Sequence, residues 1–173
     1  MQVQKGDTES FGILVERYQA KLLRYGKKFL SNIHDIEDLA QDIFIKAYRN
    51  IRGFNPKMRF SPWIYRIAHN EFINTIRKAK RMPVLMFDFD KLIPHLFAKE
   101  TSDQDVNEKD MKAMLNDGLD KIDRKYREPL ILYYLEEMNY REISEILHIP
   151  ISTVGIRLKR GRKFLKKQLN KKI

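Results

Sequence analysis

The sequence contains no cysteine. This absence excludes disulfides, thiolate metal sites and cysteine nucleophiles, and it is compatible with a reducing cytoplasm. No apolar run approaches the length of a membrane span, and the first ten residues lack the apolar segment of a signal peptide. We therefore expect a cytoplasmic protein that does not insert into a membrane.

Convincing strand patterns are also missing from the sequence. Apolar residues instead recur at intervals of three and four, which is typical of amphipathic helices. Between two such helical regions, residues 88–110 carry seven acidic residues and three lysines, a charge opposite to that of both flanks. The sequence predicts an all-α fold of two small helical domains, residues 1–84 and 111–173, joined by an acidic linker, residues 85–110.

The chain has an excess of basic residues. Thirty-four Lys and Arg against 23 Asp and Glu give a net charge of +11 and a pI near 9.7. From Arg157 to the C-terminus there are nine Lys or Arg and no acidic residue. This distribution favours a polyanionic partner, above all nucleic acid.

Residues 140–167 show the spacing of a helix-turn-helix. Ile143, Ile146 and Leu147 precede a short break at residues 148–150, and Val154 and Leu158 resume the pattern after it. His148 stands in the turn, where glycine is usual because the backbone often needs a positive φ, and histidine tolerates that region better than most residues. Such a motif places its second helix in the major groove of DNA.

The second helix of this motif has a predicted inner and outer face. If Ile151, Val154 and Leu158 face inward together with Leu165, polar and basic side chains must face outward. We predict the following DNA contacts: Ser152, Thr153, Ile156, Arg157, Lys159, Arg160 and Lys163. The alternative is a solvated basic helix whose cations complement the helix dipole.

Capping residues predict where the other helices begin. A helix should follow the capping side chains of residues 7–10 and run to about Leu30, and a second should run from a cap at Asp35 to Gly53. Ser61 and Pro62 predict the cap and first position of a third helix. Asp123 predicts a later helix in which Pro129 produces a tight first turn or a kink.

The outer face of the second helix carries acidic, amide and apolar side chains. Its members are Asp38, Gln41, Asp42, Ile45 and Arg49. The acids alone could simply complement the helix dipole, because they lie near the helix start. Two carboxylates without further ligands do not make a divalent-metal site, so we expect no metal and no cofactor.

Aromatic, cationic and amide side chains alternate in and after the loop that follows. The set comprises Phe54, Asn55, Lys57, Arg59, Phe60, Trp63, Arg66, Asn70, Asn74 and Arg77. Flat side chains stack on unpaired bases while cations follow the backbone, so this pattern suits single-stranded nucleic acid. The alternative is that Phe54, Phe60 and Trp63 are core residues.

Three segments, in this order, resemble the bacterial sigma factors of the extracytoplasmic-function group: RYGKKFLSNIHDIEDLAQDIFIKAYRNIRGF, FSPWIYRIAHNEFIN and YREPLILYYLEEMNYREISEILHIPISTVGIRLKRGRKFL. The resemblance implies a region-2-like domain over residues 1–84 and a region-4-like domain over residues 111–173. It also implies that the outer face of the second helix docks on core RNA polymerase. The loop and third helix would open and capture the minus-ten element of promoter DNA, and the helix-turn-helix would read the minus-thirty-five element as duplex.

Two positions depart from the family's pattern. Gly155 stands where a basic residue is common, and Ile156 where a small polar residue is common. The missing cation puts the promoter sequence in doubt. The resemblance to the family implies an anti-sigma partner. No residue of this chain indicates one by itself.

These observations favour a promoter-specificity subunit that binds core RNA polymerase and catalyses no covalent reaction. It requires no homo-oligomer. The alternative is a dimeric helix-turn-helix regulator that binds duplex operator DNA. An RNA-binding helical protein would use the charge but leave the order of the three segments unexplained, and an enzyme is the least favoured class.

Overall fold

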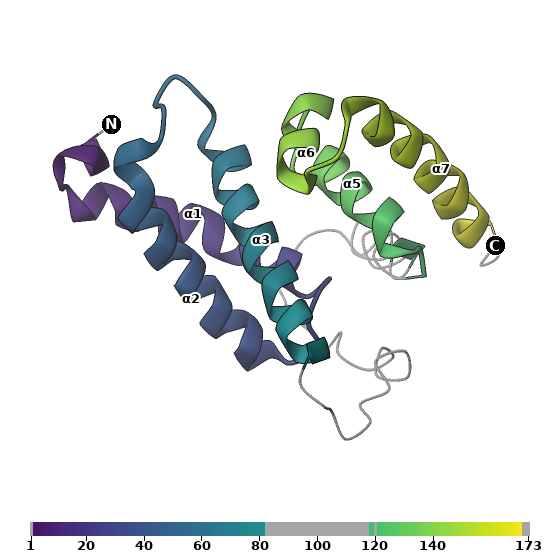
Figure 1. Cartoon of the computed structure of the whole chain (residues 1–173), viewed down its shortest axis with the longest axis horizontal. Coiled ribbons are helices and arrows are strands. Elements are labelled where there is room, and N and C mark those ends of the chain that lie inside the picture. Colours follow the sequence, from purple (N-terminus) through teal and green to yellow (C-terminus); the bar gives the residue numbers. More distant parts are fainter. Residues whose placement is uncertain (1, 82–117, 120, 171–173) are drawn as a thin grey trace, which may run out of the picture. The chain divides into compact units, whose positions relative to one another are not determined.

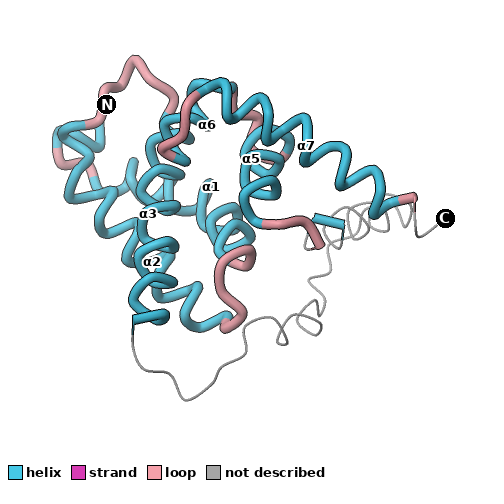
Figure 2. The backbone as a smooth tube through the Cα atoms, turned by 45° about the vertical axis from the view of Figure 1, so that its right-hand side comes forward, coloured by secondary structure: helices cyan, strands magenta, loops and turns pink. Residues whose placement is uncertain are grey.

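The computed structural model describes residues 2–81, 118–119 and 121–170. All regular elements in this part of the chain are helices, joined by short loops, as the sequence predicts (Figure 1, Figure 2). The chain divides into two compact units, Met1–Ala98 and Lys99–Ile173, and each has a hydrophobic core. The predicted linker, residues 85–110, lies outside the described residues, as do the apolar positions Met111, Met114 and Leu115.

Three long helices form the N-terminal unit (Figure 1). They are α1 (Thr8–Gly26), α2 (Ile33–Asn50) and α3 (Phe60–Arg81), and the short 3₁₀ helices η1 (Gln2–Lys5) and η2 (Ile51–Gly53) precede α1 and follow α2. Helix α2 packs against both α1 and α3. The fully buried side chains include Leu22, Tyr25, Ile36, Ile43, Ile64, Tyr65 and Phe72. Each side chain of this size contributes about 1.5–3 kcal/mol when it is fully buried.

Helix α1 begins where the sequence predicts and ends earlier. The side chain of Asp7 accepts hydrogen bonds from the amides of Glu9 and Ser10, which caps the helix. The helix ends at Gly26 and not near Leu30, because the bonds that follow change to the i→i−3 pattern: the amides of Lys28 and Phe29 donate to the Tyr25 and Gly26 carbonyls, at 3.0 and 2.8 Å. The apolar stripe therefore predicts which residues pack, and it does not predict where the helical backbone stops.

The predicted caps of α2 and α3 are wrong. Asn32 caps α2 in place of Asp35, since its side-chain oxygen accepts the His34 amide at 3.0 Å, and Asp35 lies in the first turn. Helix α3 begins at Phe60, so Ser61 and Pro62 lie inside its first turn. Proline is tolerated there because the first amides of a helix have no partner within the helix.

The C-terminal unit contains α5 (Arg124–Tyr134), α6 (Tyr140–Leu147) and α7 (Ile151–Leu169). Asp123 caps α5, as predicted, by accepting the Lys125 amide at 3.1 Å. Pro129 lies inside α5, and the Tyr126 amide donates to the Asp123 carbonyl at 2.9 Å in a tight first turn. The core of this unit includes Leu130, Leu132, Met138, Ile143, Ile146, Val154 and Leu158.

Helices α6 and α7 form the predicted helix-turn-helix. Asn139 and Glu142 close a capping box at the start of α6, which satisfies two amides reciprocally. His148 ends α6 in the left-handed conformation, with φ 52° and ψ 46°, as its place in the turn predicts. The Ser144 hydroxyl donates to the Ile149 carbonyl at 2.6 Å and fixes the turn from its other side.

The prediction that Ile151 faces inward is wrong. Its side chain is 50% exposed, whereas Val154 and Leu158 are buried. Ile151 is the first residue of α7. Periodicity gives the angular position of a side chain around the helix, and it does not say how far along the helix the neighbouring elements extend.

Candidate nucleic-acid interface

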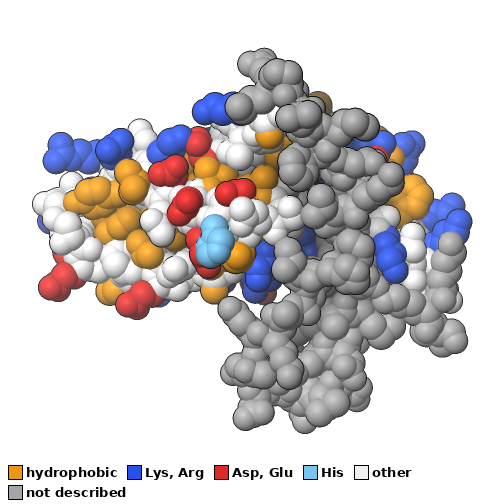
Figure 3. All heavy atoms as spheres, turned by 90° about the horizontal axis from the view of Figure 1, so that it is seen from below, with side chains coloured by type: hydrophobic (Ala, Val, Ile, Leu, Met, Phe, Trp, Pro, Cys, Tyr) orange, Lys and Arg blue, Asp and Glu red, His pale blue; other side chains and the backbone are white. Residues whose placement is uncertain are grey.

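The outer face of α2 combines acidic and apolar side chains. Asp38, Gln41, Asp42, Ile45 and Arg49 are all exposed, as the sequence predicts. Figure 3 shows acidic and hydrophobic side chains beside one another on the surface of the molecule. This mixture suits a protein partner better than DNA, because DNA would repel the carboxylates.

Two exposed apolar side chains of the N-terminal unit escape sequence reasoning. Ile13 on α1 is 57% exposed and Tyr48 on α2 is 38% exposed. Between the two helices lies a hollow of about 180 Å³, whose lining includes Val15, Phe44 and Gln41. One sign of an exposed apolar side chain here was present in the sequence: Ile13 falls outside the apolar stripe of its helix.

The loop between η2 and α3 is built around three aromatic rings. Phe54 is buried, with 4% of its surface exposed, and its ring centroid lies 5.6 Å from that of Phe60 and 5.2 Å from that of Trp63. The rings of Phe60 and Trp63, both half-buried, are 5.4 Å apart. The ring of Phe54 is thus enclosed and packs against the other two, and its contact with DNA stays a prediction.

Polar residues of the same loop are exposed. Asn55, Lys57 and Arg59 all reach the surface, and the side-chain oxygen of Asn55 accepts the Lys57 amide at 3.0 Å in a local turn. Beyond the loop, Arg66, Asn74 and Arg77 are exposed on α3 and Asn70 is half-buried. The predicted cations and amides therefore reach the surface of the N-terminal unit, in the loop and along α3.

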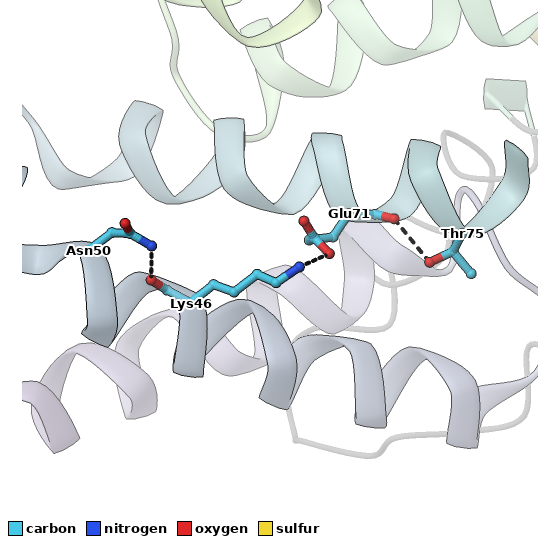
Figure 4. A network of polar contacts seen from close by, with 4 residues as sticks. All are labelled: Lys46, Asn50, Glu71 and Thr75. Carbon is cyan, nitrogen blue, oxygen red and sulfur yellow. Dashed lines mark hydrogen bonds and ion pairs between the residues drawn. The ribbon is translucent and has the colours of Figure 1, made fainter. Parts of the chain in front are cut away.

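An ion pair joins α2 to α3 beside this region. The ammonium group of Lys46 contacts the carboxylate of Glu71, and Figure 4 shows the two side chains reaching toward each other between the helices. Asn50 donates to the Lys46 carbonyl at 2.8 Å, and the Thr75 hydroxyl donates to the Glu71 carbonyl at 3.0 Å. These two bonds end on backbone carbonyls and lie within α2 and α3, so the ion pair itself is the polar contact that crosses between the two helices.

Next to the ion pair lies a hollow of about 300 Å³. Its lining comprises Lys46, Glu71, Asn74, Thr75, Arg77 and Lys78. Three cations against one carboxylate give it a positive character that suits a phosphate group. Sequence reasoning identified Asn74 and Arg77 and missed Lys46, because only the packing of α2 on α3 brings Lys46 to them. It also missed Lys78, which follows Arg77 on α3.

Helix α7 presents a basic surface to solvent. Ser152, Ile156, Lys159, Arg160 and Lys163 are exposed, whereas Thr153 and Arg157 are half-buried. Ile156 is 53% exposed, so the surface carries one apolar side chain among its polar and cationic ones. An apolar side chain can contact the methyl group of thymine, while cations hold phosphates.

Comparison with known proteins shows the family of this chain. The Sigma-70 region 2 family model matches residues 14–82, and the Sigma-70 region 4 model matches residues 112–165. The ECF RNA polymerase sigma factor SigW of Bacillus subtilis (strain 168) is 37% identical, over 97% of this chain and 93% of that protein. This chain belongs to the ECF sigma factors. The ECF RNA polymerase sigma-E factor of Escherichia coli (strain K12) is 30% identical to it, over 92% of this chain and 86% of that protein.

Solved structures share the fold of this sigma factor. CnrH in complex with the cytosolic domain of CnrY gives a TM-score of 0.68 at 24% identity, and the match covers 98% of this chain and 93% of that chain. The sigma factor RpoE of Bartonella quintana, in complex with the anti-sigma factor NepR, gives 0.72 at 23% identity, with 94% and 98% covered.

Family membership settles the function class. The chain is an RNA polymerase sigma factor that directs transcription initiation at specific promoters, and it is not an enzyme. The alternative of a dimeric operator-binding regulator is therefore set aside. None of the helices in the described part of the chain combines the length and apolar character that crossing a bilayer requires. In the same residues, no three His, Cys, Asp or Glu side chains gather so that they could hold a metal ion.

A buried carboxylate lies beneath the basic surface of this sigma factor. Glu128 of α5 is 7% exposed, and its side-chain oxygen accepts a hydrogen bond from Nε of Arg124 at 2.5 Å. Burial raises the pKa of Glu128 above its ordinary value, although Arg124, Arg127 and Arg157 oppose the shift. Since Arg157 belongs to α7, the charge of Glu128 acts on a residue predicted to contact DNA.

Tyrosines border the other flank of α7. The ring of Tyr133 lies 4.9 Å from that of Tyr134 and 5.6 Å from that of Tyr140, and Arg162 of α7 donates to the Tyr134 hydroxyl at 3.4 Å. Sequence reasoning gave these rings no role, because their clustering depends on how α5 and α6 pack.

Proposed function

We propose that the N-terminal unit performs two tasks with two different surfaces. The outer face of α2 docks on core RNA polymerase, through Asp38, Gln41, Asp42, Ile45 and Arg49. The loop and α3 melt the minus-ten element and bind the exposed strand. The observation that supports this division is chemical: the α2 face carries carboxylates beside exposed apolar groups, whereas the loop and the α3 face carry cations, amides and aromatic rings.

Strand capture would use three kinds of contact. Phe60 and Trp63, steadied by the enclosed Phe54, offer rings for stacking on unpaired bases. Asn70 and Asn74 offer hydrogen bonds to base edges. Lys57, Arg59, Arg66 and Arg77 hold phosphates, and the hollow beside Lys46 and Glu71 extends this cationic track toward α2.

The C-terminal unit would read the minus-thirty-five element as duplex. Helix α7 offers hydroxyl and apolar side chains in its first two turns, Ser152, Thr153 and Ile156, which are the positions that reach base edges in this motif. Arg157, Lys159, Arg160 and Lys163 follow and would contact phosphates or bases.

Run-off transcription tests this proposal. Purified core RNA polymerase should initiate from a matched promoter only when this sigma factor is added. Substitutions in the α2 face should then abolish co-elution with polymerase, whereas substitutions in the loop should spare co-elution and impair transcription from duplex DNA. Equal loss of co-elution from both sets would contradict the division of tasks.

The proposal also includes the setting in which the protein works. It acts in the cytoplasm as a single copy bound to polymerase, and an anti-sigma protein holds it inactive. Support for that partner comes from the solved relatives CnrH and RpoE, whose structures contain the cytosolic domain of CnrY and the anti-sigma factor NepR. Affinity purification of the tagged chain from its own cells tests for such a partner. A second protein that co-purifies with the chain in fractions free of polymerase would support an anti-sigma partner. Recovery of polymerase alone would contradict this part of the proposal.

A further inference from the structure

Helix η1 reaches across the N-terminal unit to the point where α2 gives way to the loop. The side-chain amide nitrogen of Gln4, Nε2, donates to the Ile51 carbonyl at 2.9 Å and to the Phe54 carbonyl at 2.7 Å. One amide group therefore uses both of its N–H bonds on residues 47 and 50 positions away in the sequence.

The two carbonyls lie at a place where helical hydrogen bonding ends. Carbonyls at the end of a helix have no partner within the helix and need one from elsewhere. The Ile51 carbonyl also accepts the Phe54 amide at 3.1 Å, so Gln4 completes a closed turn at η2. Directly after this turn come the enclosed ring of Phe54 and the exposed residues 55–59.

Helix η1 is itself fixed in position. Val3 is buried, with 4% of its surface exposed, and the Gly6 amide donates to the Val3 carbonyl at 3.1 Å. Gly6 has a φ of 96°, a value that glycine adopts without strain. This backbone conformation lets the chain turn from η1 into α1. The Asp7 amide donates to the Gln2 carbonyl at 3.4 Å, and the Ser10 hydroxyl of α1 lies 2.6 Å from a side-chain oxygen of Asp7 and 3.0 Å from that of Gln2. The Gln4 amide is thus held ready on a segment anchored at both ends.

We propose that Gln4 is a positioning residue for promoter opening: η1 holds the start of the loop so that Phe60 and Trp63 are presented to the melted strand. Gln4 lies outside residues 14–82, which the Sigma-70 region 2 family model matches. The inference rests on the proposed role of the loop in strand capture, and its test separates the two.

The chemistry of the contact suggests the variants. Both partners are carbonyl oxygens, which only accept hydrogen bonds. Gln4→Glu keeps the shape of the side chain and replaces the donor with an acceptor that the carbonyls repel. Gln4→Met removes the donor without adding charge. Gln2→Glu is the charge control, because Gln2 is exposed and the substitution adds the same charge two residues away from Gln4 without removing the donor to either carbonyl.

Hydrogen exchange of the free full-length chain measures the positioning directly. In Gln4→Glu and Gln4→Met, the hydrogen-bonded amides of Phe54, Lys57 and Met58 should exchange about 3- to 10-fold faster, the size expected from losing an intramolecular hydrogen bond. Amides of α2 before residue 47 should be unaffected, and Gln2→Glu should match the wild type. Unchanged exchange in both Gln4 variants would overturn the positioning role while leaving the proposed function of the loop intact.

Promoter opening by the complex with core polymerase gives the functional measurement. Both Gln4 variants should co-elute with polymerase as the wild type does, open duplex promoter about 3- to 10-fold less, and recover on a promoter with a pre-melted bubble. A unit that had merely lost its fold would fail on both templates and in co-elution. Faster exchange combined with normal opening would overturn the role of Gln4 in promoter opening, whereas normal opening by Trp63→Ala would overturn the proposed role of the loop.

Discussion

Gly26 of α1 lies so close to Ile36 of α2 that a Cβ atom at Gly26 would be 2.6 Å from Cγ2 of Ile36. The same atom would be 2.7 Å from Cζ of Phe72 on α3. Gly26→Ala should therefore lower the free energy of unfolding by about 1–3 kcal/mol, since both neighbours are fully buried and must shift. Urea denaturation of the two proteins measures the difference.

Gly12→Ala provides the control within the same helix. No atom lies within 4 Å of the position that its Cβ would occupy. Alanine should raise the free energy of unfolding there by about 0.5–1 kcal/mol, because it restricts the unfolded chain and favours the helix. Destabilisation by both substitutions would contradict the close contact as the cause.

Trp63→Ala should impair promoter opening without weakening polymerase binding. Loss of a ring that stacks on an unpaired base costs about 1–3 kcal/mol. A promoter with a pre-melted bubble should restore much of the activity, because the cost of unpairing is then removed. Trp63→Phe keeps a ring against Phe54 and Phe60 and should lose less. Failure of the bubble to rescue Trp63→Ala would contradict a role in melting.

Replacement of both Gln41 and Asp42 with alanine should weaken binding to core polymerase. Truncation of side chains at the centre of a protein interface costs about 2 kcal/mol or more at positions that matter. Asp35→Ala is the control, since Asp35 is an exposed carboxylate in the first turn of the same helix. Titration of labelled protein with polymerase measures the affinities, and equal affinities for the double variant and Asp35→Ala would remove α2 from the docking surface.

Arg160→Ala should weaken binding of the minus-thirty-five duplex by about 1–3 kcal/mol if the guanidinium reads a base. On a duplex in which the contacted base pair is changed, Arg160→Ala should weaken binding less, because the wild type has already lost the contact between Arg160 and that base. Arg141→Ala removes an exposed arginine on α6 whose Nε lies 3.6 Å from a carboxylate oxygen of Glu145. Fluorescence anisotropy at fixed salt compares the two, and equal losses on all sequences would identify Arg160 as a phosphate contact only.

Glu128 should make folding sensitive to pH. Burial raises the pKa of Glu128 in the folded chain, so between the unfolded-state pKa and the raised one the folded chain binds more protons. The free energy of unfolding contributed by this group is therefore greatest below the unfolded-state pKa and falls as pH rises through the folded-state pKa. Glu128→Gln lacks this decline, so the stability of the variant relative to the wild type should rise across that window.

Urea titrations at a series of pH values test the Glu128 prediction. The carboxyls of Asp7 and Asp123, whose pKa values are lowered mainly by hydrogen bonds from Ser10 and Lys125 respectively, are common to both proteins and cancel in the difference. A difference that does not change with pH would show that Glu128 titrates alike in the folded and unfolded chains.

Local patterns in the sequence predicted local structure well. Asp123 caps α5, and His148 adopts positive φ, because both properties depend on neighbours a few residues away. The cap of α2 was misplaced because Asn32 and Asp35 are both capable of capping. Which of the two side chains caps α2 depends on the residue at which the turn after α1 ends and the helical backbone begins.

Contacts between distant residues were beyond sequence reasoning. The amide of Gln4 bonds carbonyls at Ile51 and Phe54, and Lys46 pairs with Glu71 across two helices. No periodicity encodes such pairs, since they arise from how the helices pack. The same holds for Phe54: the sequence marked an aromatic cluster, and only the three-dimensional arrangement shows which ring is enclosed.

The turn at His148 has a consequence for recognising related proteins. Its backbone satisfies the geometry that the motif demands with a residue other than glycine. A pattern search that insisted on glycine at this position would reject the chain, although the two helices on either side are placed as the motif requires. In this chain the positive φ of His148, and not a glycine, makes the turn between the two helices.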